Sequence, residues 1–302
     1  MTLTAVFFIT ISVFAHVGWN LISKSRQPSG TFFLIANTAA LLLVIPLLGY
    51  YRSVFVWVPS AVWALVAATG FFQTIYYLSL AGAYRRGDMS LAYPMLRALP
   101  VLFITAVSFI LGRGHQIRPF GLLGILMVAF GCLLLPLKSF RHLHFRDYLA
   151  LCCLLALVAA VGTTGYTLVD DEALRQLRTH FHPWMGYNSV TLFYVVLQTL
   201  SIEIWLGLYV LLFRAERNQS LYVWRKDRVH AAVAGIVLTF AYGLVLASMA
   251  YVVNISYVAA FRQLSIPLGA AAGMLLLNEP RYFPKLIGVG VIMGGLMLVA
   301  LV

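Results

Sequence analysis

Charged residues are scarce in this chain of 302 residues: Asp, Glu, Lys and Arg together make up 10% of it, whereas 62% of it is hydrophobic. Soluble domains carry roughly 25% charged residues, so the composition excludes an ordinary water-soluble protein. The apolar stretches are about 20 residues long, which is the length of a membrane-spanning helix, and they do not alternate as barrel strands do. We therefore expect an all-α integral membrane protein with the lipid bilayer as its solvent.

Residue patterns that carry enzymatic or metal chemistry are also missing from the sequence. The three cysteines lie in apolar runs and have neither ligand spacing nor a pairing pattern. The sequence contains no HExxH metal pair, no nucleotide-binding loop and no acid pair suited to intramembrane proteolysis. The first segment lacks the basic start and the cleavage site of a removable signal peptide. We expect no enzyme, no cofactor and no metal.

Ten apolar segments are expected to span the membrane. A basic and polar linker at 138–147 divides them into a first five-helix unit, 1–137, and a second, 148–302. The stretch 170–185 reads as a separate, short amphipathic helix at the interface. The expected spans are 3–23, 31–50, 58–83, 88–111, 117–137, 147–169, 187–213, 229–252, 254–277 and 283–302.

Short matches relate the two halves of the chain. In order, they pair Gly18–Asn20 with Gly165–Thr167, Asp88–Ser90 with Asn254–Ser256, Leu96–Leu99 with Phe261–Leu264, and Gly124 and Gly131 with Gly288 and Gly295. Because five is odd, the second unit has to enter the membrane in the opposite orientation. The sequence therefore predicts two inverted five-helix repeats, an arrangement that places a binding site near the midplane.

Two arginines lie deep inside apolar spans, Arg97 in the fourth and Arg262 in the ninth. A charge near mid-bilayer costs at least about 2.5–3.5 kcal/mol, so such groups face a wet cavity or an opposite charge. A guanidinium offers five donors in a planar fork that matches carboxylate or phosphate oxygens. We expect the pair to bind an anion. The alternative is that both are neutralised by protein oxygens and only fix helix packing.

Other polar side chains have the spacing of a cavity lining. His16 and Asn20 are four residues apart and share a helix face with Trp19 nearby, and Gln73 and Tyr77 are spaced in the same way. Tyr93 and Tyr166 are similar candidates. The alternative for all of them is interhelical hydrogen bonding or aromatic packing.

Acidic side chains are few within the apolar runs. Glu203 lies deep in the seventh span and is the candidate coupling group, either protonatable or a counter-charge to an arginine; the alternative is an interfacial glutamate. Asp170 and Asp171 are expected at a water interface, just beyond the sixth span.

The basic residues predict the orientation of the chain. The net charge of +12 does not indicate nucleic acid as a partner, since no soluble domain carries it. Fourteen Lys and Arg residues lie in loops after odd-numbered spans and five in loops after even-numbered spans. The positive-inside rule then places the odd loops in the cytoplasm and both termini outside.

The stretches Ala15–Lys24 and Tyr93–Pro100, together with the two five-span units, resemble the drug/metabolite transporter superfamily in its ten-span EamA-type branch. Within it, the chain resembles a group that includes phosphonate-utilization-associated membrane proteins. The resemblance implies a bacterial inner-membrane carrier whose cavity is lined by spans one, three, four, six, eight and nine, with spans two and seven peripheral. It also implies termini in the cytoplasm, against the charge count. The fourth span departs from the family by ending in Leu111–Gly114 rather than a Gly-Glu pair.

The sequence thus predicts a secondary transporter that moves a small anionic or zwitterionic metabolite by alternating access. Two alternatives stay open: a carrier of neutral or cationic metabolites, and a lipid scramblase or intramembrane lipid-handling protein. The expected partners are the small-molecule substrate and the bilayer, and a second copy of the chain is possible but not required.

Overall fold

The computed structural model describes residues 1–24, 26, 28–86, 89–135, 137, 151–182, 184–268 and 282–301. Within these ranges all the regular structure is helical. Seven of the helices are long and apolar enough to cross a membrane. The expected all-α, multi-pass membrane architecture is confirmed at this level.

The first half of the chain forms helices close to the expected spans. Ser29 begins the second helix by accepting a hydrogen bond at its side-chain oxygen from the backbone N–H of Phe32, 3.1 Å away. Short 3₁₀ turns at Phe55–Trp57 and Gly114–Gln116 connect neighbouring helices. The helices are α1 (Leu3–Lys24), α2 (Gly30–Tyr50), α3 (Ser60–Arg86), α4 (Met89–Ile110) and α5 (Pro119–Leu134).

The second half adds an amphipathic helix, α8, between two long ones. The linker 138–147 and the later part of the expected ninth span lie outside the described residues. The elements are α6 (Leu151–Phe181), α7 (Tyr187–Leu212), α8 (Arg214–Lys226), α9 (Arg228–Ser248), η4 (Met249–Tyr251), α10 (Ile255–Phe261), η5 (Arg262–Leu264) and α12 (Phe283–Ala300).

The prediction that the sixth span ends at 169 was wrong, as was the separate helix over 170–185. Helix α6 runs without a break for 31 residues. No Gly or Pro interrupts 166–181, and buried Ala173, Leu174, Leu177 and Phe181 continue its apolar face at spacings of three and four residues. A span of ordinary length was expected, and the polar residues after 169 were taken as its end.

The helix that carries Arg262 changes from an α-helix to a 3₁₀ helix at that residue. Helix α10 ends at Phe261, and η5 begins with Arg262. Pro267 follows five residues later and has no N–H to donate to a carbonyl of the preceding turn. The carbonyl groups of Arg262 and Gln263 are instead contacted by the backbone N–H of Ser265. The break lies beside the cavity described below.

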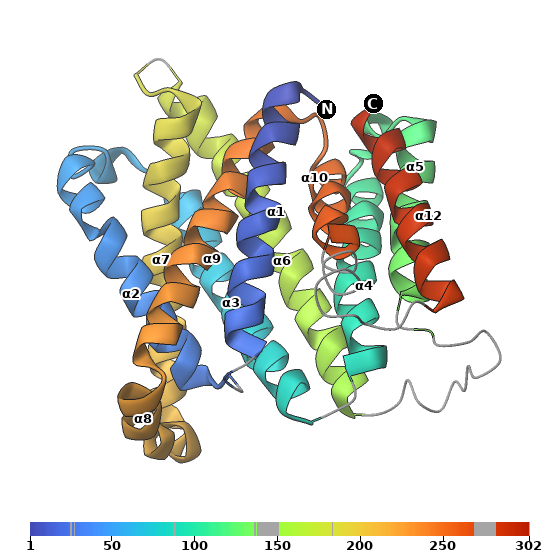
Figure 1. Ribbon diagram of the computed structural model, residues 1–302. Helices are drawn as coiled ribbons and strands as arrows, with labels where there is room; N and C mark the ends of the chain where they lie inside the picture. The colour runs from blue at the N-terminus through green and yellow to red at the C-terminus, as the bar shows by residue number, and fades with distance from the viewer. Residues whose placement is uncertain are drawn as a thin grey trace.

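The helices form a bundle in which α5 and α12 pack together at one flank and α2 and α7 at the other (Figure 1). Between the flanks, α3 packs against α6 and α1 packs against α9. Both termini lie at the same end of the bundle, and α8 lies at the opposite end (Figure 1).

Glycine sets how closely some helices approach. At Gly235 of α9, an added Cβ would overlap the backbone carbonyl of Ala36 in α2, whereas at Gly243, on the same helix, the nearest atom would be the Val195 Cγ2, 3.8 Å away. Helices α2 and α9 therefore touch through their backbones at Gly235, as small residues allow in membrane bundles.

We predict opposite effects for the same substitution at these two positions. Gly235→Ala should lower the free energy of unfolding by about 1–3 kcal/mol, because the backbone of α2 has to move away. Gly243→Ala is the matched control and should be neutral or slightly stabilising, since Ala favours the helix. Thermal denaturation in detergent measures both, and equal melting temperatures for the two variants would contradict the proposed backbone contact.

Candidate functional site

A cavity lies between the central helices of the bundle. It is bordered by α1, α3, α4, α6, α9 and η5, which correspond to the expected spans one, three, four, six, eight and nine. Its lining residues are His16, Trp19, Gln73, Tyr76, Tyr77, Arg97, Tyr166, Leu238, Tyr242 and Arg262.

This cavity brings together seven of the nine residues that the sequence singled out for a substrate site. Asn20 is not among its lining residues, and the Asn20 side-chain amide donates to the backbone carbonyl of His16 at 2.7 Å, within α1. The side chain of Tyr93 lies outside the described residues.

Both arginines face the middle of the bundle. Arg97 and Arg262 line the cavity above and also an adjoining one, between α4, α6 and α10. The guanidinium carbon of Arg262 is 5.4 Å from the centre of the Tyr242 ring, a cation–π contact. No described acid forms an ion pair with Arg262. Two permanent cations therefore share one interior space.

His16 adds a further donor to this space. The indole Nε1 of Trp19 donates to His16 Nδ1 at 2.7 Å. An Nδ1 that accepts a hydrogen bond belongs to a neutral ring with its proton on Nε2. The buried Nε2 has no hydrogen-bond partner among the described residues. The His16 N–H and the guanidinium groups of Arg97 and Arg262 thus line the cavity from three helices. Donors of this kind are suited to the oxygens of an anion.

The space itself is narrow. Each of the two cavities leaves 20–30 Å³ for the centres of water molecules, enough for roughly one or two waters. Small-molecule sites commonly measure about 300–1,000 Å³. The side chains therefore enclose the site, and a ligand larger than one or two waters could enter only if the helices separated.

The expectation that Asp170 lies at a water interface was wrong. Its side chain is fully buried, because α6 continues past it. Tyr194 Oη donates to Asp170 Oδ1 at 2.7 Å, while Gln198 Nε2 and Tyr242 Oη donate to Oδ2 at 2.8 and 2.6 Å. Three donors from α7 and α9 therefore surround one carboxyl group, which replaces the water that it lacks.

Asp171 does lie closer to solvent, as expected, and so does the neighbouring Glu172. Asp171 and Glu172 are partly exposed and pair with Arg113 at 3.0 and 2.9 Å. Arg113 stands where the resembled family has a Gly-Glu pair, and here it joins the end of α4 to α6. Within the described ranges, no group of three or more His, Cys, Asp and Glu side chains is arranged to hold a metal ion.

Glu203, the coupling candidate, is not among the residues that line these cavities. Its Oε2 accepts a hydrogen bond from Asn37 Nδ2 and its Oε1 one from Thr38 Oγ1, both at 2.7 Å. Both partners belong to α2. The carboxyl of Glu203 therefore links α7 to α2 at the flank of the bundle.

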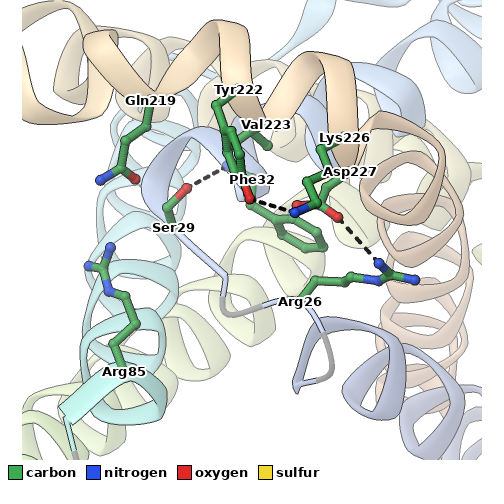
Figure 2. A pocket seen from close by; sticks show the side chains of 9 residues that line it. All are labelled: Arg26, Ser29, Phe32, Arg85, Gln219, Tyr222, Val223, Lys226 and Asp227. Carbon is green, nitrogen blue, oxygen red and sulfur yellow. Dashed lines mark hydrogen bonds and ion pairs between the residues drawn. The ribbon is translucent and has the colours of Figure 1, made fainter.

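A larger cavity opens at the end of the bundle that carries α8 (Figure 2). It measures about 590 Å³ and shares no lining residue with the central cavity. Its arginines are opposed by acids: Arg26 lies 3.6 Å from Asp227, and Arg85 lies 3.9 Å from Glu216. Lys226 donates to Tyr222 Oη at 2.9 Å (Figure 2). Because each of these two arginines has an acid within 4 Å and the cavity faces solvent, we place the candidate site at the central arginines despite their smaller space.

Comparison with known proteins supports the fold alone. No family model matches the chain, and no curated protein matches it in sequence. A solved structure described only as "Crystal structure of protein" has a TM-score of 0.70 and 17% identity, covering 100% of this chain and 98% of that chain. The bundle is thus similar to an experimentally observed fold.

Four residues of the interior polar network escaped the sequence analysis: Asp170, Tyr194, Gln198 and Tyr242. One signal was present, since Tyr194 and Gln198 are four residues apart and place two hydrogen-bonding groups on one face of α7. The acid that they surround was hidden by the misplaced end of the sixth span.

We predict that Tyr194→Phe lowers the free energy of unfolding by about 1–3 kcal/mol, because it removes one donor from a buried carboxylate. Tyr187→Phe on the same helix is the control and should change stability little, since Tyr187 is 41% exposed. Unfolding in mixed micelles measures both. Equal stabilities would mean that the Tyr194 hydrogen bond contributes nothing.

Proposed function

We propose that this chain is a secondary transporter for a small anionic or zwitterionic metabolite. The observation that carries the proposal is the convergence of Arg97, Arg262 and the unused N–H of His16 on one interior cavity. Cations in the middle of an apolar bundle are costly, and they mark substrate or ion pathways in membrane proteins. The expected lining residues Trp19, Gln73, Tyr77 and Tyr166 would complete the binding site.

The helix contacts support an inverted repeat. Under the proposed repeat, α1, α2, α3, α4 and α5 correspond in order to α6, α7, α9, α10 and α12. The α3–α6 contact then corresponds to the α9–α1 contact, and the α2–α9 contact corresponds to the α7–α3 contact. All four contacts are present. The glycines behave in the same way. A Cβ at Gly124 would lie 2.6 Å from the Gly295 carbonyl oxygen, and one at Gly131 would lie 2.8 Å from that of Gly288.

Alternating access follows from this arrangement. In transporters built from inverted repeats, one group of helices rocks against the other around a site at the midplane. The narrow central cavity corresponds to a closed conformation between the two open ones. We further propose membership of the EamA-type drug/metabolite transporters and residence in the bacterial inner membrane, on the resemblance of Ala15–Lys24 and Tyr93–Pro100.

The position of α8 supports an orientation with both termini outside. Helix α8 and its basic residues lie at the end of the bundle opposite to the termini (Figure 1). The positive-inside rule assigns that end to the cytoplasm.

One observation favours the alternative of a neutral or cationic substrate. Aromatic side chains contribute five of the ten lining residues, namely Trp19, Tyr76, Tyr77, Tyr166 and Tyr242, and aromatic rings attract cations. The two arginines oppose a cation in the same space, so the anionic substrate remains the proposal. A scramblase would need a polar groove open to lipid, whereas the arginines line an enclosed space.

We predict that Arg97→Ala and Arg262→Ala each abolish substrate binding while the protein still folds, because each removes a permanent positive charge from the site. A thermal-shift screen of purified protein against organic anions, phosphonates and amino acids identifies the ligand class, and counterflow in liposomes measures transport. Arg52→Ala is the control, since Arg52 is exposed outside the cavity.

Normal binding by both cavity variants would make the arginines structural. Movement of labelled lipid without any solute would favour the scramblase, and product formation in detergent would favour an enzyme. Saturation of counterflow by a neutral or cationic compound alone would favour the alternative substrate class.

A further inference from the structure

One tyrosine connects the buried carboxyl to the arginine site. Tyr242 Oη donates to Asp170 Oδ2 at 2.6 Å, and the ring of Tyr242 lies 5.4 Å from the guanidinium carbon of Arg262. Tyr242 also lines the central cavity. The acid and the cation are thus separated by a single side chain, so that the charge of one is felt by the other in a medium of low dielectric constant.

The hydrogen bonds around Asp170 can serve both forms of its carboxyl group. The amide nitrogen of Gln198 can only donate, and it bonds to Oδ2. The hydroxyls of Tyr194 and Tyr242 can donate or accept. With all three donating, the carboxylate is satisfied. When the carboxyl is protonated, the Tyr194 hydroxyl can turn and accept the new O–H at Oδ1. The same side chains can therefore hydrogen-bond to the carboxyl group in either form.

Among the residues that the structure describes, Asp170 is the acid of this network. Its titratable neighbours are tyrosines: Tyr77 on α3, Tyr166 on α6, Tyr194 on α7 and Tyr242 on α9. Beyond them, around the cavity, lie Arg262 on η5, Arg97 on α4 and the neutral ring of His16 on α1. Glu203 and Asp171 are bonded elsewhere.

The charge of the site therefore depends on Asp170. An ionised Asp170 places a negative charge on the far side of Tyr242 from Arg262 and offsets part of the positive charge that Arg262 presents to the cavity. A protonated Asp170 removes that offset. A proton on Asp170 strengthens the attraction for an anion, and by thermodynamic reciprocity a bound anion strengthens the attraction for the proton.

We propose that Asp170 is the proton-binding site of this transporter, and that a proton and the anion bind together, as in a proton–anion symporter. This inference rests on the proposed function, since it needs an anion at Arg97 and Arg262. Coupling between two sites in one protein commonly changes affinity by roughly 5- to 150-fold.

The test uses the purified full-length protein with methanesulfonate as the probe, because a sulfonate keeps its charge from about pH 5 to about pH 8, where folded proteins are commonly most stable. Calorimetry in buffers of different ionisation enthalpy counts the protons taken up on binding. We expect proton uptake, and an affinity that rises roughly 5- to 150-fold from the alkaline to the acidic limit.

The Asp170→Asn variant should bind methanesulfonate without taking up a proton at this position, and its affinity should no longer depend on pH. Glu203→Gln is the matched control and should keep both properties of the wild type. Infrared difference spectra supply a second measurement on the wild type, so that the test survives if Asp170→Asn does not fold. A protonated-carboxyl band should increase when the anion is added at fixed pH.

The outcomes separate the two proposals. Binding that takes up no proton and leaves the infrared band unchanged would overturn the role of Asp170 while leaving the transporter intact. Loss of proton uptake in Glu203→Gln but not in Asp170→Asn would also overturn it. A wild type that does not bind methanesulfonate at either pH limit would contradict the anion site itself, and with it the proposed function.

Discussion

The carboxyl group of Asp170 is the constraint on which the interior of this bundle depends. A carboxylate that water cannot reach has to be surrounded by donors, and removing one leaves a costly unsatisfied group. The donors come from α7 and α9, so three helices are held in one register around a single side chain. Tyr242 is one of these donors and also contacts Arg262. The position of the cation beside the cavity is therefore tied to the requirement of the buried acid.

Backbone contacts set the width of the cavity that results. An added Cβ at Gly162 of α6 would lie 2.9 Å from the Phe72 carbonyl oxygen on α3, and one at Gly165 would overlap the Phe72 ring. The two helices touch at these glycines, and one turn away the rings of Tyr76 and Tyr166 meet with their centres 5.8 Å apart. Small residues thus bring the aromatic lining together, which explains why the closed site is narrow. Opening it requires movement of whole helices, because the backbones already touch.

The sequence predicted those residues of the site that can be recognised within a single helix. Arg97 and Arg262 stand out because a charge in an apolar run is expensive, and His16 and Trp19 because they share a turn. Glu203 can be recognised in the same way, yet it faces α2, and the facing direction of α7 cannot be read from its own residues. The burial of Asp170 was not predicted for a different reason. A span of usual length ends before it, and only the packing of 170–181 against α7 and α9 shows that the helix continues inside the bundle.

The location of the acid in only one half of the chain has a mechanistic consequence. Under the proposed repeat, Gly18–Asn20 corresponds to Gly165–Thr167, so Asp170 corresponds to Ser23, a buried serine. In alternating access by inverted repeats, the two halves exchange conformations between the inward-open and outward-open states. A group present in both halves would meet the same pair of surroundings in either state. Under the proposed alternating access, a carboxyl present in one half alone would meet different surroundings in the two states, whereas the paired arginines would exchange equivalent surroundings.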